Sequence, residues 1–569
     1  MTRALAVIAI AGAVAGGLVG PRPARGQITV QVPLPSAHVL PRTRAERSGY
    51  LETSTFADVN SFIDSLRLAD LHYTMGLFGR SPEGRWIPYI IATRLKVSSP
   101  EEARRLGRPV VYVQANIHAG EVEGKEALLA LVRDLLAEKK PNVLDSLVLI
   151  AMPIYNTDGN EKFALQAVNR SEQNGPVMVG QRPNGQGLDL NRDYVKAEAP
   201  ETRASLALFA RWDPDVFVDL HTTDGSFHGY ALTYAPPLAP VGIAGAFVRD
   251  SLLPVLRRRM RARDGFETFD YGNFDVEDAG YRGGAAGAAR APGDTAVHAW
   301  ETYDHRPRYG VNYVGIRGRA AILSEAFSHD PFERRVKSTY AFVHEILSLV
   351  AARPASFRRI ARVQATGPKP GTMLAIRAHM TRTPYRGPVI VEDMEHLLDT
   401  TDLTEPGVPR GMRRTGNYRT LQLDVYDRFD AEHSVPVPAA YAIPAEREDV
   451  VRALRMHGIT VEQTRAPVKV SVTAFTVDSI EHARRTFQGH NETTLHGRWL
   501  APRSATLEAG SYLVRTGQPL GALAVYLLEP ESDDGLVTWN TLDAVLQNGA
   551  EFPVTRVRAA PVVSHKPVP

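Results

Sequence analysis

The first structural signal comes from residues 108–139, which read RPVVYVQANIHAGEVEGKEALLALVRDLLAEK. The run at 108–116 is apolar and rich in β-branched residues, as is typical of a buried strand. The run at 124–139 places its apolar residues at helical spacing. His118 and Glu121 lie between the two runs. The stretch therefore predicts a strand, a turn with two potential metal ligands, and a helix; taken alone, Glu121 could equally cap that helix.

The same order of strand and helix recurs further along the chain. Runs of both kinds are expected at 146–156, 200–212, 215–221, 319–327 and 332–353. Strands that alternate with helices favour an α/β fold, here a mixed, mostly parallel sheet flanked by helices.

The pattern changes after about residue 354. Residues 352–371 form a polar, proline-bearing passage that could be a linker, and short alternating runs follow at 468–477 and 521–530. We therefore expect an α/β domain over 27–355, the candidate catalytic domain, and a β-rich region over 356–569. The β-rich region could bind carbohydrate or a cell surface, or it could pack against the first domain and shape its cleft. Its acidic stretch at 527–540 has no calcium-loop spacing and is interpreted as a solvated turn.

Composition excludes several classes of protein. The chain has 569 residues and a net charge of +3, and it has no basic block, so nucleic acid is not an expected partner. It contains no cysteine, so disulfides, thiolate ligands and a cysteine nucleophile are excluded. Any metal must be held by His, Asp or Glu. Nothing in the composition indicates an oligomeric state.

The N-terminus has the order of a cleaved secretory signal. Arg3 is followed by a small-apolar run at 4–20 and then by Ala24-Arg25-Gly26. The apolar run is shorter than the ~20 residues that span a bilayer, so no stable membrane anchor is expected. We predict a signal peptide over 1–26, cleaved near Gly26 and Gln27, and a secreted or periplasmic protein.

Polar side chains follow each of the predicted strands. They are His118, Glu121, Asn156, Asp158, His221 and Glu325. In an open α/β sheet, ligands bind beyond the carboxyl ends of the strands, so these side chains should meet at one rim. Two histidines and one glutamate form a known ligand set for catalytic zinc. The alternative for each residue alone is a helix cap or a structural histidine.

A polar segment at 179–204 adds a second group of candidates. Arg182, Asn191 and Arg192 offer hydrogen-bond donors that suit a carboxylate or a developing oxyanion. Any one of them alone could be an ordinary residue of a solvated loop.

Five motifs in this order resemble the zinc carboxypeptidase family, the relatives of carboxypeptidase A. They are HAGE, YNTDGN, GLDLNRDY, VDLHTTDG and ILSEAF, and the resemblance covers roughly residues 50–350. It implies a peptide substrate and one zinc ion per chain, held by His118, Glu121 and His221. It also implies that Glu325 takes a proton from the zinc-activated water and passes it to the leaving amine.

The resemblance assigns further roles around the metal. Asn191 and Arg192 match the pair that binds the terminal carboxylate of a peptide, and Asp189 matches a carboxylate that orients the first zinc histidine. Arg182 fits the arginine that polarises the scissile carbonyl, with Arg170 as its rival.

The resemblance is incomplete at two points. The family's Asn-Arg-Asn is Asn191-Arg192-Asp193 here, and the extra negative charge could weaken binding of an anionic C-terminus. The substrate-capping tyrosine is best matched by Tyr313, with Tyr309 as the second choice. The remaining nearby histidines, His228, His298, His305 and His329, are interpreted as structural or rim residues.

The leading hypothesis is an exported zinc metallocarboxypeptidase that hydrolyses C-terminal peptide bonds with Glu325 as general base. One alternative is a zinc amidohydrolase acting on N-acyl amino acids or cell-wall peptides. The other is a non-catalytic secreted binding protein of the same fold.

Overall fold

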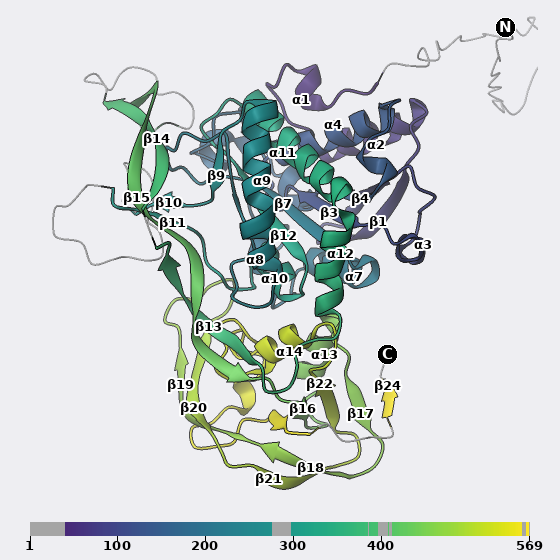
Figure 1. Ribbon diagram of the computed structural model, residues 1–569, viewed down its shortest axis with the longest axis vertical. Coiled ribbons are helices and arrows are strands. Elements are labelled where there is room, and N and C mark those ends of the chain that lie inside the picture. Colours follow the sequence, from purple (N-terminus) through teal and green to yellow (C-terminus); the bar gives the residue numbers. More distant parts are fainter. Residues whose placement is uncertain are drawn as a thin grey trace, which may run out of the picture.

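The computed structural model describes residues 40–275, 297–384, 386–396, 408, 412–559 and 565–567. The predicted signal peptide at 1–26 lies outside these residues. An α/β part with a central sheet occupies the upper half of Figure 1; most of the β-rich region lies below it, and β14 and part of β15 lie beside it at the upper left. No helix in the described ranges is long and apolar enough to cross a membrane.

The central sheet has the strand order β1-β2-β4-β3-β7-β12-β8-β9. Its strands are β1 (Thr74–Arg80), β2 (Trp86–Ala92), β3 (Val110–Ala115), β4 (Val148–Met152), β7 (Val216–Thr222), β8 (Leu232–Ala235), β9 (Thr268–Asp270) and β12 (Ala320–Ala326). The neighbours β4, β3, β7 and β12 run parallel, as do β8 and β9, whereas the pairs β1–β2, β2–β4 and β12–β8 are antiparallel. The mixed, mostly parallel sheet predicted from the sequence is thus confirmed.

Helices cover both faces of this sheet. The longer ones are α2 (Phe56–Leu68), α3 (Pro100–Leu106), α4 (Glu123–Ala137), α7 (Pro200–Trp212), α9 (Leu253–Arg259), α10 (Gly310–Ile316), α11 (Phe332–Ala352) and α12 (Pro354–Gln364). Short turns of helix are α1 (Arg44–Arg47), α5 (Thr157–Glu161), α6 (Gln166–Asn169) and α8 (Ala244–Phe247), and a small hairpin is formed by β5 (Ala164–Leu165) and β6 (Met178–Val179). Alternate residues of the buried strands enter two separate cores. One core contains α2, α4, α9 and α11, and the other contains α7, α10 and much of the β-rich region.

The C-terminal region contributes to two sheets and a hairpin. One sheet joins β10 (Asn273–Phe274) and β11 (Ala299–Glu301) of the α/β part to β13 (Met373–Arg382), β14 (Gly387–His396) and β15 (Met412–Pro436). The other contains β16 (Ala440–Ile443), β17 (Glu462–Thr464), β18 (Val468–Thr473), β21 (Arg503–Leu507), β22 (Tyr512–Arg515), β23 (Thr555–Val557) and β24 (His565–Pro567). The hairpin is β19 (Phe475–His482) with β20 (Thr493–Trp499), and the helices are α13 (Glu448–Met456) and α14 (Gly521–Leu528). Because β15 pairs with β11, strand pairing crosses from the α/β part into this region.

Two sequence interpretations outside the central sheet are wrong. The passage expected to be a linker contains α12, whose Phe357 and Ile360 are buried. The run at 521–530, expected to be a strand, contains helix α14, which is buried almost all round. A short run that is apolar on every side has no usable periodicity, so it cannot be distinguished from a buried strand by pattern alone.

Glu201 on α7 is a buried carboxylate that should make stability depend on pH. Asn184 Nδ2 donates to both of its oxygens, and burial raises the pKa of Glu201 from 4.5 to about 7. Because the folded state holds this proton more tightly than the unfolded state, its contribution to stability is lost as the pH rises through about 7.

Glu201→Gln should therefore stabilise the protein at about pH 8, by at most about 3 kcal/mol, and should have little effect near pH 5. Thermal unfolding of both proteins at these two pH values measures the difference. A shift of equal size at both would contradict the assignment.

Candidate active site

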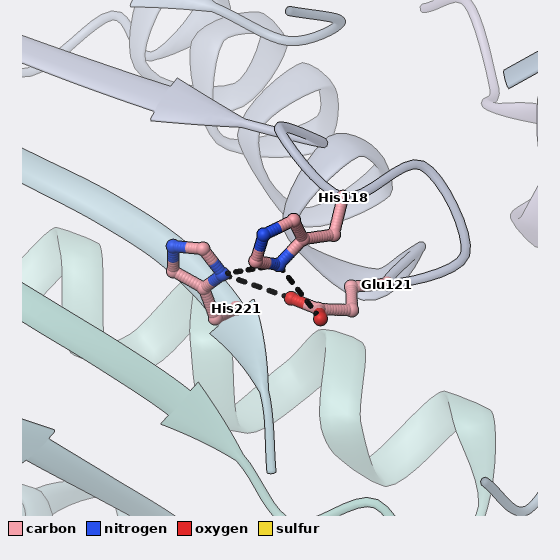
Figure 2. Close-up of side chains that lie close together, drawn as sticks. All are labelled: His118, Glu121 and His221. Atoms are coloured by element: carbon pink, nitrogen blue, oxygen red, sulfur yellow. Dashed lines mark hydrogen bonds and ion pairs between the residues drawn. The ribbon is translucent and has the colours of Figure 1, made fainter. Parts of the chain in front are cut away.

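Three potential metal ligands meet at the carboxyl end of the central strands. His118 and Glu121 lie in the turn between β3 and α4, and His221 lies near the end of β7 (Figure 2). Asn116 begins the turn with a φ of 65°, and Glu121 N–H donates to the carbonyl oxygen of His118 at 3.0 Å. This tight turn returns Glu121 to the side of the strand end.

The three side chains approach one another closely. His118 Nδ1 lies 3.0 Å from Glu121 Oε1, His221 Nδ1 lies 2.9 Å from Glu121 Oε2, and the two Nδ1 atoms are 3.2 Å apart. All three residues are buried. In the described part of the chain, they form a group whose potential ligand atoms lie close enough together to hold one metal ion.

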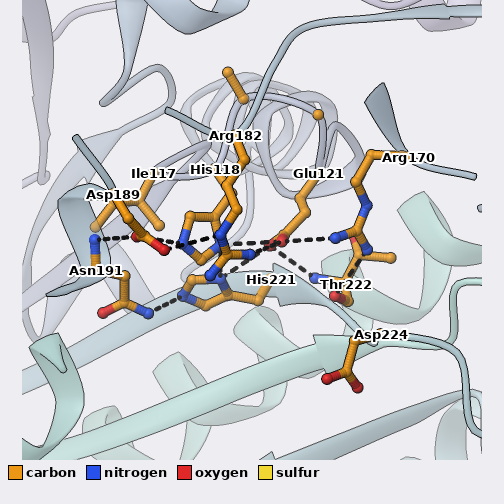
Figure 3. Close-up of polar contacts among 12 residues, drawn as sticks. Ile117, His118, Glu121, Arg170, Arg182, Asp189, Asn191, His221, Thr222 and Asp224 are labelled. Atoms are coloured by element: carbon orange, nitrogen blue, oxygen red, sulfur yellow. Dashed lines mark hydrogen bonds and ion pairs between the residues drawn. The ribbon is translucent and has the colours of Figure 1, made fainter. Parts of the chain in front are cut away.

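The outer nitrogen of each histidine faces a carboxylate. His118 Nε2 lies 3.1 Å from Asp189 Oδ1, and His221 Nε2 lies 3.2 Å from Asp219 Oδ2 (Figure 3 shows the Asp189 side). A carboxylate only accepts hydrogen bonds, so it favours the tautomer with its proton on Nε2 and leaves Nδ1 free to bind a metal. Burial alone would raise the pKa of Asp189, but the positive charge of Arg182 and the hydrogen bond with His118 hold this pKa well below its ordinary value.

This donor set fits a zinc ion. With the protons on Nε2, two imidazole lone pairs and a carboxylate converge within 4.8 Å of one another in a buried place. Three acceptors turned towards one point repel each other unless a cation lies between them. Zinc accepts this His₂Glu set and keeps a further position for water or substrate.

Arg170 holds the ligand Glu121 from behind. Its guanidinium donates to Glu121 Oε1 at 3.2 Å and to the carbonyl oxygens of Thr222 and Thr223 (Figure 3). The Arg170 side chain crosses so close to Gly120 that a Cβ at this position would lie 2.7 Å from its Cγ. Glycine in HAGE therefore allows the arginine to reach the carboxylate.

Glu325 lies beside the metal ligands on the next strand. The parallel register of β12 and β7 pairs Glu325 with His221, so both side chains project at the same level of the sheet. Glu325 is only 8% exposed, and its Oε2 has no hydrogen-bond partner among the described residues. Burial, followed by the charges of Glu121 and Asp224 and opposed by His221, raises its pKa well above the ordinary value.

One cavity of about 350 Å³ contains these groups and most of the predicted substrate residues. It is lined by His118, Glu121, Arg170, Arg182, Asn191, Arg192, His221, Thr222, Asp224, Tyr271, Asn273, Glu301, Thr302, Tyr303, Asp304, Arg306, Tyr309, Val311, Leu323 and Glu325. Asp193, whose charge was expected to weaken anion binding, is directed elsewhere. It accepts hydrogen bonds from Lys196 Nζ at 2.7 Å and from Ala199 N–H at 2.8 Å, just before α7.

The expectation for Tyr313 is wrong. Its side chain is fully buried on α10, and its hydroxyl lies 2.8 Å from Nδ1 of His457 in the C-terminal region. It cannot cover a substrate from there. Tyr309, the second choice, does line the cavity, with its ring 4.0 Å from the guanidinium carbon of Arg192.

Several polar residues near the motifs serve the scaffold. Asn156 caps α5 through Gly159 N–H, and the buried Asp158 accepts a hydrogen bond from Ser81, so neither reaches the cavity rim as expected. Glu123 and Glu126, in the first turn of α4, are both buried and hydrogen bonded, Glu123 to Thr222 and Arg335, and Glu126 to Thr53 and Ser54. The histidines outside the ligand set, His228, His298, His305 and His329, do not line the cavity.

Asp219 is the main residue that the sequence interpretation missed. It precedes His221 by two positions on β7, and residues two apart on a strand face the same side. That spacing was a usable signal for a carboxylate beside the second zinc histidine. Gln114 Nε2 donates to the other oxygen of Asp219 at 3.0 Å and fixes its orientation.

The fold and this site define a zinc metallopeptidase of the carboxypeptidase type. Residues 59–237 match the family model described as zinc carboxypeptidase. The chain therefore carries a zinc carboxypeptidase domain. It is a hydrolase of the metallocarboxypeptidase class, and its metal is zinc.

Proteins with similar sequences carry the same class name. Carboxypeptidase 2 of Trichophyton tonsurans is 26% identical over 495 residues, which cover 84% of this chain and 81% of that protein. Carboxypeptidase M of Mus musculus is 30% identical over 191 residues, which cover 31% of this chain and 38% of that protein.

Solved structures of the same class overlap about half of the chain. A metallo-carboxypeptidase from Pseudomonas aeruginosa, in complex with (2-guanidinoethylmercapto)succinic acid, has 20% identity and a TM-score of 0.34, covering 52% of this chain and 69% of that one. The carboxypeptidase A from Helicoverpa armigera has 16% identity and a TM-score of 0.37, covering 54% and 75%.

Proposed function

We propose that this protein is an exported metallocarboxypeptidase that removes C-terminal residues from peptides. The observation that carries the proposal is the shared cavity, in which the His118–Glu121–His221 group, Glu325 and the pair Asn191–Arg192 line one space. The N-terminal pattern of 1–26 supports export.

In this proposal, Asn191 and Arg192 bind the terminal carboxylate of the peptide. Arg192 stacks on Tyr309, and such a planar guanidinium can bind a carboxylate through two parallel hydrogen bonds. Asn191 is held by the Gly310 N–H, which donates to its Oδ1 at 2.9 Å. This arrangement would place the last peptide bond, rather than an internal one, beside the metal group.

We assign Arg182, rather than Arg170, to the scissile carbonyl. The Arg182 side chain is 38% exposed and donates its Nε–H to Asp189, while its Nη1 lies 3.5 Å from Glu121 Oε1 at the cavity, so its guanidinium is more accessible to a substrate than that of Arg170. The Arg170 side chain is 7% exposed, and its terminal nitrogens are already hydrogen bonded. A donor aimed at a developing oxyanion stabilises the transition state, whereas Arg170 fixes the ligand Glu121.

One zinc ion per chain, held by His118, Glu121 and His221, would lower the pKa of a water ligand towards ~7 and polarise the carbonyl. Glu325 accepts the proton of the attacking water and returns it to the leaving amine. This role is supported by its buried Oε2, which has no hydrogen-bond partner among the described residues, and by its register opposite His221.

The proposal is tested by digesting a peptide library with and without a metal chelator and reading the products by mass spectrometry. Stepwise loss of C-terminal residues that stops with the chelator is expected. Internal cleavage, or release of N-acyl groups only, would replace the proposal with an endopeptidase or an amidohydrolase.

Amidation of the peptide C-terminus provides a quantitative prediction. It removes the charge that Arg192 binds, so kcat/KM should fall by about 10- to 100-fold. The Arg192→Ala protein should be slower on the free-acid peptide and should lose the distinction between acid and amide. Steady-state kinetics on a matched peptide pair measures both effects, and equal rates on the two peptides with the unmodified enzyme would contradict the role of the pair.

A further inference from the structure

The C-terminal region contacts the loops that carry the substrate-binding pair. Arg308, Tyr309 and Gly310 are consecutive, and each makes a different contact: Arg308 with the C-terminal region, Tyr309 with Arg192, and Gly310 with Asn191. This short segment therefore connects the C-terminal region directly to the cavity.

Asp534 is the anchor on the C-terminal side. Arg308 donates to it twice, from its backbone N–H to Oδ2 at 2.6 Å and from its Nε–H to Oδ1 at 3.0 Å. Trp539 Nε1–H also donates to Oδ1 at 3.0 Å, and Asp534 is fully buried. The acidic stretch 527–540 was interpreted from the sequence as a solvated turn. Its Asp534 is instead buried and hydrogen bonded.

The arginine is fixed on its other sides as well. Arg308 Nη1 donates to Glu492 Oε1 at 2.6 Å, and the guanidinium carbon lies 4.5 Å from the ring centre of Trp539. With backbone and side chain both held, little freedom remains for Tyr309 and Gly310, the next two residues. Arg192 packs on the ring of Tyr309, and Asn191 accepts the N–H of Gly310. Restricting Tyr309 and Gly310 therefore also restricts Arg192 and Asn191.

A second contact joins the C-terminal region to the 189–192 loop, which carries Asn191 and Arg192. Gln488, between β19 and β20, accepts the backbone N–H of Asp189 at 2.9 Å. Asp189 in turn accepts from the backbone N–H of Asn191 and faces His118. The C-terminal region therefore holds the 189–192 loop through Asp189 and through the 308–310 segment.

We propose that the C-terminal region is part of the substrate site and that Asp534 is a positioning residue for the Asn191–Arg192 pair. The proposal rests on the proposed function, in which that pair binds the peptide carboxylate. The sequence left two roles open for the C-terminal region: binding carbohydrate or a cell surface, or packing against the α/β domain and shaping its cleft. The proposal favours the second role.

Asp534→Asn tests the proposal, with Asp543→Asn as the matched control. Asp543 lies in the same region but accepts its hydrogen bonds from Asn540 and Thr493, within that region. For Asp534→Asn we expect KM for a free-acid peptide to rise about 10-fold, while turnover of the amidated peptide and the zinc content stay unchanged. Asp543→Asn should leave all three quantities within about twofold.

The outcomes separate the two proposals. A wild-type enzyme that does not distinguish acid from amide would overturn the proposed function, whatever Asp534 does. A folded Asp534→Asn protein with unchanged KM, or with equal losses on both peptides, would overturn the positioning role. If Asp534→Asn does not fold, Arg308→Lys decides: it keeps the charge but loses the Nε–H bond, so a KM rise confined to the free-acid peptide supports the proposal and its absence overturns it.

Discussion

Glu325→Gln should lower kcat for peptide hydrolysis by about 10²- to 10⁴-fold and leave zinc binding intact. Glutamine keeps the size and one acceptor of the carboxylate but cannot take a proton. In the fold, Glu325 is paired in register with His221 and is not among the three ligand residues, so the metal group should survive the change. The loss corresponds to about 3–5 kcal/mol of transition-state stabilisation.

The control for Glu325→Gln is Asp224→Asn, which removes a carboxylate from the same cavity. If the loss reflected only the charge of the cavity, both variants would lose activity to a similar extent. We expect Asp224→Asn to stay within about tenfold of wild type, because it does not supply the base. Steady-state kinetics, elemental analysis of zinc and a melting curve are needed for each protein. A Glu325→Gln protein with nearly full activity would refute the general-base role.

The four parallel strands of the central sheet, β3, β4, β7 and β12, could be predicted because the information that specifies them is local. Each buried strand, such as 110–115 or 216–222, is a short apolar run bounded by polar residues, and each neighbouring helix has its own period. The parallel order then brings the strand ends to one rim, which is why residues as distant as His118 and Glu325 could be expected in one cavity.

The errors at Tyr313 and Asp534 have a common physical origin, since both concern contacts between distant parts of the chain. Tyr313 was expected at the substrate as the best match to the family's capping tyrosine, but its hydroxyl contacts His457, 144 positions away. Asp534 looked like a solvated residue, yet it holds Arg308 across 226 positions. Local pattern reports whether a residue is polar, but not which buried partner satisfies it.

The C-terminal region changes how the α/β part should be regarded. Its residues share a hydrophobic core with α7 and α10, and β15 continues the pairing of β11. Truncation near residue 355 would expose this shared core as well as release the 308–310 segment. Variants of single contacts are therefore the better probes of this region.

His221→Ala should abolish stoichiometric zinc binding and lower activity by more than about 10³-fold. His221 supplies one of three ligands, and its loss leaves only His118 and Glu121 to hold the ion. Zinc that binds the folded state alone raises its stability, so a chelator should lower the melting temperature of the wild-type protein. The same chelator should not change the melting temperature of His221→Ala, which gives a test that does not depend on activity.

Asp219→Asn provides the graded comparison for His221→Ala. The asparagine side chain would keep an oxygen beside His221 Nε2 but without a negative charge, and changes to such partners typically weaken metal binding about 10- to 100-fold. Zinc affinity measured in a series of buffered zinc concentrations should therefore rank wild type above Asp219→Asn and Asp219→Asn above His221→Ala. Retention of one zinc per chain by His221→Ala would exclude it as a ligand. An Asp219→Asn protein with wild-type affinity would show instead that the imidazole is oriented by the strand alone, because β7 already fixes its backbone between β3 and β12.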